Sequence, residues 1–220
     1  AFFNRSFLDP AIKGTFPEDL VLLLKELDYL PEYTQSELEL IKHNTIDILG
    51  INYYQPRRIM KKESTERLSD KPMPDDYFDN YIWPERKMNP YRGWEIYEKG
   101  IYDCLINFRD NYGNLPCFIS ENGMGVEGEE RYINAGGRID DDYRIEFVRD
   151  HLKYVHQALQ EGCNVKGYHM WTCMDNWSWT NAYKNRYGFI AVDLTQEGKR
   201  TIKKSGYWFK EVSDNNGFDA

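Results

Sequence analysis

Glu121 stands where its carboxylate could do chemistry, because it closely follows a short apolar run at residues 115–119. A charge at the end of a strand that looks buried is costly. In parallel α/β barrels, the carboxyl ends of the strands are where catalytic groups sit. The alternative is a strand that turns at Asn122-Gly123 into a β-hairpin. Residues 124–138 are rich in glycine and charge and hold no alternating partner strand, which favours the catalytic interpretation.

Two other predicted strands also end in residues whose side chains could take part in binding or catalysis. Asn52 and Tyr54 are two positions apart, so on a strand their side chains point to the same side. An amide and a phenol there could bind a hydroxyl or orient a carboxylate, while the alternative is that Tyr54 belongs to the core. Trp171 ends the third strand and either packs in the core or forms a floor on which a sugar ring stacks.

The loop at residues 175–188 is unusually dense in aromatic rings and hydrogen-bond donors. Ser178, Lys184 and Tyr187 could together offer two hydroxyls and one ammonium group to an anion. For Lys184 the alternative is an ordinary solvated charge, which composition alone favours.

The elements that must position these residues follow a repeated helix-then-strand order. Helices are predicted at 17–30, at 35–43, from Trp94 to Phe108, from Ile145 to Leu159 and near 205–212, and strands at 46–54, 115–121 and 164–171. This order indicates α/β architecture with parallel strands. A (β/α)8 barrel needs about 250 residues. Because only three strands are predicted, residues 1–220 are together expected to form one part of a larger domain. Three strands leave two open edges, so self-association is expected to be a risk.

Bulk composition narrows the class of partner and the compartment. The net charge of -8 over 220 residues argues against nucleic acid or an anionic membrane as partner. No apolar stretch approaches the roughly 20 residues that cross a bilayer, and no signal peptide is expected. Cys104, Cys117 and Cys163 look like buried thiols, which suits a reducing cytoplasm. The cysteines show no paired metal spacing, and neither a metal nor a cofactor is expected.

Several of these segments resemble glycoside hydrolase family 1. Residues 119–123 resemble its nucleophile motif, residues 47–54 its sixth barrel strand, and residues 167–171 with 175–179 and 186–193 its eighth strand and the following loop. The resemblance covers essentially the whole chain but only the C-terminal part of the family's (β/α)8 TIM barrel, about strands 6 to 8 with their helices. It implies hydrolysis of β-glycosides with retention, which needs two carboxyls about 5–5.5 Å apart.

The resemblance also implies a role for each strand-end residue. Glu121 is the expected nucleophile, and Tyr54 is the phenol that hydrogen-bonds it. Asn52 is an expected ligand of the sugar in the cleaved position, with Trp171 as the floor beneath that sugar. The family's acid/base glutamate lies in an Asn-Glu-Pro motif that this chain lacks. The chain taken alone is therefore expected to be inactive.

Ser178 bears on the substrate. Family members that act on unphosphorylated sugars carry a glutamate there, which would repel a phosphate. Ser178, a lysine and Tyr187 resemble the phosphate pocket of 6-phospho-β-glycosidases, although the usual lysine position holds Asn185 and Lys184 stands one residue earlier. Trp179 is expected beside the sugar's 4-hydroxyl. The favoured function is hydrolysis of 6-phospho-β-glucosides. The alternatives are a β-glucosidase that acts on unphosphorylated sugars, a 6-phospho-β-galactosidase and a non-catalytic sugar-phosphate-binding module.

Overall fold

The computed structural model describes residues 2–63 and 71–219. The chain divides into two compact units, the first formed by residues 1–49 and 57–84 and the second by residues 50–56 and 85–220. The prediction that residues 1–220 belong to a single catalytic barrel stays a prediction at this point.

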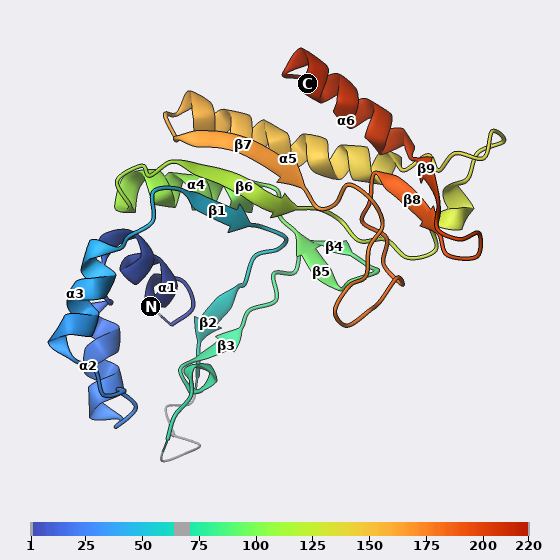
Figure 1. The fold of residues 1–220 in the computed structure, drawn as a ribbon. Helices are drawn as coiled ribbons and strands as arrows, with labels where there is room; N and C mark the ends of the chain where they lie inside the picture. The colour runs from blue at the N-terminus through green and yellow to red at the C-terminus, as the bar shows by residue number, and fades with distance from the viewer. Residues whose placement is uncertain (1, 64–70, 220) are drawn as a thin grey trace. The chain divides into compact units, whose positions relative to one another are not determined.

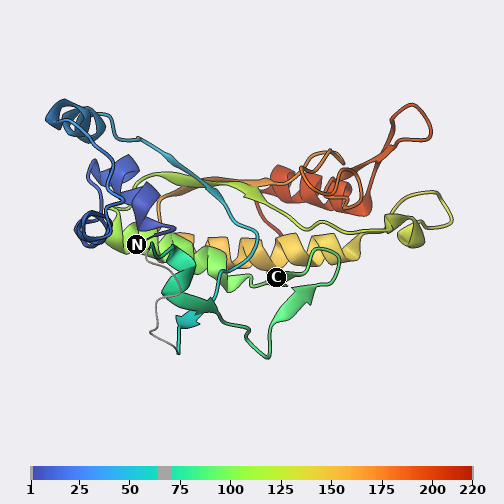
Figure 2. The same cartoon turned by 90° about the horizontal axis from the view of Figure 1, so that it is seen from below.

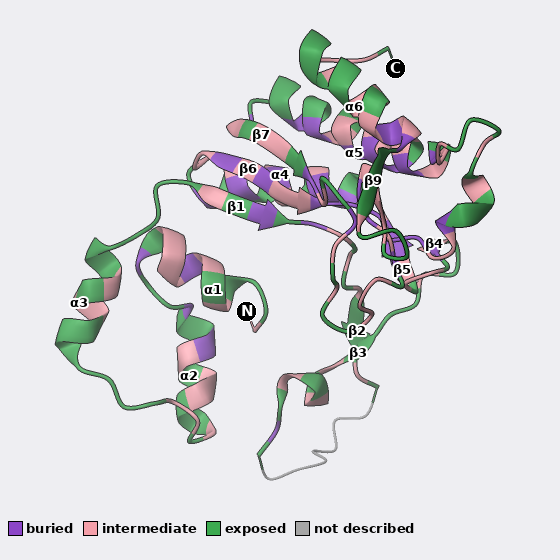
Figure 3. Ribbon diagram, turned by 45° about the vertical axis from the view of Figure 1, so that its right-hand side comes forward, coloured by how far each residue is buried: buried purple, intermediate pink, exposed green. Residues whose placement is uncertain are grey.

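The first unit is mainly helical. It contains α1 (Arg5–Leu8), a π-helical turn η1 (Asp9–Lys13), α2 (Glu18–Glu26) and α3 (Gln35–His43). The helix predicted at 35–43 is confirmed, and it begins where Thr34 and Glu37 form a reciprocal capping box. None of the residues of α3 is buried (Figure 3). The strands β2 (Ile59–Lys61) and β3 (Phe78–Asn80) form an antiparallel pair, and a 3-10 turn η2 (Pro74–Asp76) precedes β3.

A three-stranded sheet organises the second unit. Its strands are β1 (Leu49–Asn52), β6 (Cys117–Asn122) and β7 (Val165–Met170), in the order β1-β6-β7. The arrows of all three point the same way in Figure 1, and β6 pairs with β7 in parallel. The three predicted strands are therefore confirmed, and their carboxyl ends meet at one edge of the sheet.

The parallel pairing shows that the hairpin alternative at Asn122-Gly123 is wrong. Strand β6 runs through Asn122, which lies opposite Met170 of β7. Gly123 instead allows the main chain of Trp171 to come close, because a Cβ atom at position 123 would lie 1.9 Å from the carbonyl oxygen of Trp171. Any larger residue would push the ends of β6 and β7 apart.

Two helices, α4 (Lys99–Asn111) and α5 (Asp142–Gln160), cover one face of this sheet (Figures 1 and 2). Ile101 and Leu105 of α4 and Val148 of α5 are almost fully buried, as is Ile119 of β6. The apolar face predicted for α4 is thus buried, whereas that of α5 is buried only in part, because Leu159 is 43 % exposed. The chain ends in α6 (Lys204–Asn215), near the predicted helix at 205–212.

One predicted helix start is wrong. The sequence predicted a helix from Trp94, but Trp94 belongs to β5 (Trp94–Ile96), which pairs with β4 (Lys87–Asn89) in an antiparallel hairpin. The spacing from Trp94 to Tyr97 continues the helical pattern of α4 by coincidence. Regular structure is also present in two segments for which the sequence predicted no helix or strand. Residues 55–90 hold β2 to β4, and the segment before α6 holds β8 (Ile190–Asp193) and β9 (Lys199–Ile202).

A buried ion network joins four segments of the second unit. Lys203 lies 2.5 Å from Glu129 and 3.0 Å from Asp175. Arg144 pairs with Glu129 and, at 2.9 Å, with Asp141. All five residues are at most 5 % exposed. Glu129 lies in the short helical turn η3 (Glu129–Tyr132), and Asp175 in the loop after β7.

Burial alone would disfavour both cations of this network. It lowers the pKa of Lys203, and the nearby Arg144 lowers it further, while Glu129 and Asp175 act in the opposite direction. For Arg144, burial also acts to lower the pKa, but Glu129 and its other neighbours raise it above the usual value. The carboxylates are therefore what keeps two buried cations compatible with the folded state.

We expect Lys203→Met to destabilise the full-length protein by about 3–5 kcal/mol, because it leaves Glu129 and Asp175 buried without their cation. Lys204→Met is the matched control. Lys204 is 40 % exposed and pairs with Asp142 at 2.6 Å, so its loss should cost no more than about 1 kcal/mol. Urea unfolding followed by tryptophan fluorescence measures both, and equal losses would contradict the network's role.

His151 is a second buried ionisable group in α5. Its Nδ1 lies 2.7 Å from the carbonyl oxygen of Phe147, so this nitrogen carries the proton and donates. The imidazole packs against the Phe147 ring at 4.1 Å between centroids. Its Nε2 is buried and has no hydrogen-bond partner among the described residues. Burial lowers the pKa of His151 to about 4, so the folded protein keeps this imidazole neutral.

This lowered pKa predicts acid sensitivity. Between pH 6.5 and 4 the unfolded chain binds a proton at His151 that the folded chain excludes, so stability falls as the pH falls through this window, by about 3 kcal/mol in full. His151→Gln should flatten the dependence of the unfolding free energy on pH in this range. His156→Gln, at an exposed position of the same helix, should leave the dependence unchanged. An unaltered slope in His151→Gln would show that His151 does not resist protonation.

Candidate active site

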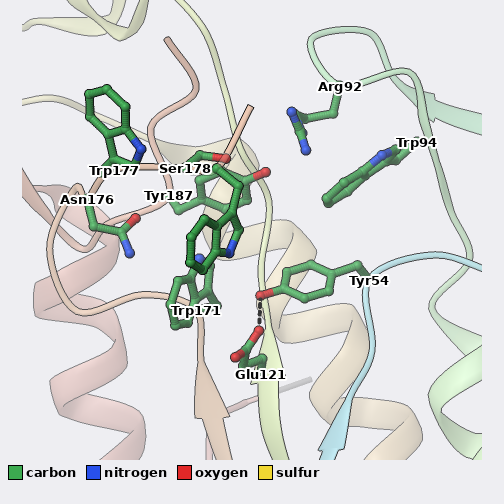
Figure 4. A pocket seen from close by; sticks show the side chains of 10 residues that line it. Tyr54, Arg92, Trp94, Glu121, Trp171, Asn176, Trp177, Ser178 and Tyr187 are labelled. Atoms are coloured by element: carbon green, nitrogen blue, oxygen red, sulfur yellow. Dashed lines mark hydrogen bonds between the residues drawn. The ribbon is translucent and has the colours of Figure 1, made fainter. Parts of the chain in front are cut away.

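A pocket lies at the carboxyl edge of the β1-β6-β7 sheet (Figure 4). All of its lining residues belong to the second unit. They are Tyr54, Arg92, Trp94, Glu121, Trp171, Asn176, Trp177, Ser178, Trp179 and Tyr187. Six of the eight predicted site residues are in this set, and Asn52 and Lys184 are not. Four tryptophans and two tyrosines make the lining strongly aromatic, and Glu121 and Arg92 are its two ionisable groups of opposite charge.

Glu121 and Tyr54 are in direct contact. The Tyr54 hydroxyl donates a 2.7 Å hydrogen bond to Oε2 of Glu121 (Figure 4). The main chain brings the two residues together, because the Tyr53 N–H donates to the Glu121 carbonyl at 2.9 Å. Burial raises the pKa of Tyr54, and its hydrogen bond to Glu121 raises it further. The phenol therefore stays protonated and fixes one oxygen of the carboxylate.

Asn122 supports this contact from behind and was not singled out in the sequence. Its side chain is fully buried, with Nδ2 donating to the Tyr53 carbonyl at 2.7 Å and Oδ1 accepting from the Tyr168 hydroxyl at 2.6 Å. One amide thus links the ends of all three strands. The clue in the sequence was a residue type with both a donor and an acceptor, next to the candidate carboxylate.

Asn52 lies beside the site but does not line the pocket. Its Oδ1 accepts a 2.7 Å hydrogen bond from the Ser120 hydroxyl, and its side chain is exposed. The predicted role of Asn52 as a sugar ligand stays a prediction.

The loop after β7 carries the remaining aromatic wall. Its start is fixed because the Trp171 N–H donates to the Asn122 carbonyl at 2.8 Å. Buried Asp175 accepts from the Gly188 N–H at 2.9 Å and so closes the loop near its end. Ser178 and Ala182 exchange two 2.9 Å backbone hydrogen bonds across the tip. This small bridge leaves the Trp179 side chain 99 % exposed at the pocket rim.

The sequence suggested Lys184 as the cation of an anion site, but the residue of this charge that lines the pocket is Arg92. The Nζ of Lys184 lies 3.5 Å from Glu127, and its side chain is 60 % exposed. Arg92, which the sequence analysis missed, lines the pocket and stacks over the Trp94 ring at 4.4 Å. Arg92 and Trp94 were overlooked because the sequence predicted no hairpin here and instead the start of a helix at Trp94. Asn176 and Trp177 were noticed only as parts of an aromatic loop.

Other kinds of site receive no support from the described residues. No group of three or more His, Cys, Asp or Glu side chains among them is arranged to hold a metal ion. In the described part of the chain, no helix has the length and hydropathy to cross a membrane. All four cysteines are free thiols; Cys117 and Cys163 are buried as predicted, whereas Cys104 is only half-buried.

Comparisons with known proteins agree with this geometry. Residues 1–218 match the family model of glycosyl hydrolase family 1. The chain is 64 % identical over 218 residues to 6-phospho-beta-glucosidase GmuD of Bacillus subtilis (strain 168), covering 99 % of the chain and 47 % of the relative. It is 33 % identical over 226 residues to a 6-phospho-beta-galactosidase of Clostridium acetobutylicum, covering 96 % of the chain and 46 % of the relative.

A solved structure gives the same result for the fold. The family 1 β-glucosidase from Thermotoga maritima superposes with a TM-score of 0.79 at 31 % identity, covering 98 % of this chain and 44 % of that one. The chain therefore spans about half the length of the relatives it matches, and its fold is the C-terminal part of their (β/α)8 barrel. The fold predicted from the sequence is confirmed, and the chain belongs to glycosyl hydrolase family 1.

Proposed function

We propose that this chain forms the C-terminal part of a single catalytic barrel that hydrolyses 6-phospho-β-glucosides to glucose 6-phosphate and an aglycone or sugar. The observation that carries the proposal is the Glu121 carboxylate, which faces an aromatic pocket at the strand ends with one oxygen bound by Tyr54. The name of the 64 % identical relative supports the substrate class. Free thiols at all four cysteines suit a cytoplasmic protein.

The geometry suits nucleophilic catalysis by Glu121. Because Tyr54 binds Oε2, Oε1 is the oxygen left to attack the anomeric carbon and form the glycosyl ester. Tyr54 keeps its hydrogen bond throughout and so holds the carboxylate in one orientation. The general acid that protonates the leaving group, and that later activates water, comes from outside this chain, since the family's Asn-Glu-Pro motif is absent from it.

The aromatic residues supply the binding surface for the sugar. We assign Trp171 as the floor under the ring and Trp179 as the contact beside its 4-hydroxyl, because both line the pocket. Flat aromatic faces cover the apolar C–H faces of a pyranose while leaving its hydroxyls to polar groups. Asn52 completes the assignment as a ligand of the sugar in the cleaved position.

A phosphate at C6 fits the wall formed by Ser178 and Tyr187. Both residues line the pocket and both carry a hydroxyl that can donate to a phosphate oxygen. A glutamate at position 178 would place a second negative charge in the same wall. Lys184 remains a candidate third ligand, although its Nζ must first leave Glu127.

Glu121→Gln should abolish nearly all turnover of the full-length enzyme, because an amide cannot form the glycosyl ester. A 2-deoxy-2-fluoro 6-phosphoglucoside should label Glu121 covalently, as peptide mass spectrometry would show. Glu127→Gln, which removes an exposed carboxylate nearby, is the control and should be labelled normally. Labelling of a carboxylate other than Glu121 would refute the assignment.

Ser178→Glu should selectively lower kcat/KM for an aryl 6-phospho-β-glucoside, by roughly tenfold or more, because it replaces a donor with a repelling charge. The unphosphorylated aryl glucoside should be spared. Thr180→Glu places the same charge at an exposed position of the same loop and should change neither. Equal losses on both substrates would assign Ser178 to folding. Lys184→Ala should act in the same direction as Ser178→Glu if Lys184 reaches the phosphate.

The wild-type enzyme decides among the alternatives in the same assay. Preference for the unphosphorylated glucoside would favour an ordinary β-glucosidase, and preference for the phosphorylated galactoside would favour a 6-phospho-β-galactosidase. Absence of turnover on all three would favour a non-catalytic sugar-phosphate-binding module.

A further inference from the structure

We infer that Arg92 is the cationic residue that selects the 6-phosphate of the substrate. This inference rests on the proposed function and names a residue outside the loop to which sequence reasoning assigned the phosphate. It is carried by the position of the guanidinium in the pocket, the absence of a countercharge and the neighbouring hydroxyls.

The β4-β5 hairpin holds Arg92 at the pocket. Buried Asn89 anchors this hairpin, because its Nδ2 donates to the Gly125 carbonyl at 2.9 Å and its Oδ1 accepts from the Tyr91 N–H at 3.1 Å. Figure 4 shows the guanidinium turned into the pocket, at the end opposite Glu121. The Trp94 ring, 4.4 Å away, supports the guanidinium from one side. A sugar whose reacting carbon faces Glu121 would therefore extend toward Arg92.

The guanidinium has no countercharge in the described part of the chain. No carboxylate there lies within 4.0 Å of Arg92, whereas Arg144 is fully paired in the buried network. The Nε of Arg92 is buried without a hydrogen-bond partner among the described residues. Its hydrogen-bond partners among the described residues are neutral, namely the side-chain oxygen of Asn181, once that amide is flipped, and the Tyr187 hydroxyl. A partly desolvated cation with open donors favours an anion as its ligand.

The groups around Arg92 suit a phosphate. Ser178 and Tyr187 line the same pocket and add two hydroxyls. Burial raises the pKa of Tyr187, and Arg92 opposes this rise, which places the guanidinium close to the phenol. A planar guanidinium can bind two phosphate oxygens at once, and the hydroxyls can donate to the remaining oxygens.

Lys184 and Asn185 explain why the cation comes from the hairpin. Lys184 is directed to Glu127. Asn185 is almost fully buried, and its amide lies 3.5 Å from the carbonyl oxygen of Tyr91, the residue before Arg92. Asn185, which stands at the usual lysine position of the 6-phospho-β-glycosidase pattern, thus packs against the segment that carries Arg92. In the inferred phosphate site, the positive charge therefore comes from the β4-β5 hairpin.

The test compares kcat/KM for an aryl 6-phospho-β-glucoside and the unphosphorylated aryl β-glucoside in the full-length enzyme. Arg92→Met should lower the preference for the phosphorylated substrate by about 10- to 100-fold, mainly through KM. Inorganic phosphate should inhibit the wild type competitively and the variant more weakly by a similar factor. Arg131→Met is the matched control, because exposed Arg131 also stacks on a ring, that of Tyr91 at 4.9 Å, and should leave the preference unchanged.

Each outcome decides the inference. A preference that survives in Arg92→Met, or equal losses on both substrates, would overturn it and leave the proposed function standing. A wild type without preference for the phosphorylated substrate would overturn both. If Arg92→Met does not fold, as judged by circular dichroism, Arg92→Gln, which also removes the charge but keeps a polar side chain, decides by the same ratio. A fall of about tenfold or more then supports the inference, and an unchanged ratio refutes it.

Discussion

The buried ion network centred on Lys203 is the constraint on which the carboxyl edge of the sheet depends. Only one strand pair, β8 with β9, gives regular structure to the long segment between β7 and α6. Asp175 holds the pocket-forming part of that segment, since it binds both Lys203 and the Gly188 N–H. Burying so many charges carries a desolvation penalty, so such a network favours one arrangement of the loop more than it adds stability. The arrangement it selects is the one that brings Ser178 and Tyr187 to the same pocket as Glu121.

The edge of the sheet that carries Glu121 is held by a second, neutral set of bonds. Asn122 joins the ends of β1 and β7 through its amide, and the Gly123 that follows it lets the Trp171 carbonyl come close. Glu121 therefore stands on a strand end that is fixed from both sides, and Tyr54 then needs only one hydrogen bond to orient its carboxylate. A rigid backbone with one hydrogen bond to the carboxylate would position Glu121 for the proposed nucleophilic role with little reorganisation.

The sequence was informative where a periodic pattern reports burial. The strands that end near Asn52, Glu121 and Trp171, and the buried face of α4, were predicted correctly because apolar runs and 3.6-residue spacing follow the core. It was uninformative where the partner is distant along the chain. The sequence analysis did not single out Arg144 or Lys203, since nothing local shows that Glu129 pairs with both of them. Arg92 was missed for a different reason, because a short hairpin of three-residue strands leaves little pattern in the sequence.

The positions of the charged groups in the pocket also suit the proposed binding of a phosphorylated sugar in one orientation. A phosphate brought within a few ångströms of an anionic nucleophile is repelled by several kcal/mol at the effective dielectric constant of about 20 near a protein surface. Arg92 and Glu121 lie at opposite ends of the pocket, with aromatic rings in its walls (Figure 4). Under the proposed function, an arginine at the far end would attract the phosphate away from Glu121 and so orient the anomeric carbon toward Glu121. In the reversed orientation the phosphate would lie next to Glu121, and repulsion between the two would disfavour that orientation. Arg92 and Glu121 would thus determine how the sugar is oriented in the pocket as well as how tightly it binds.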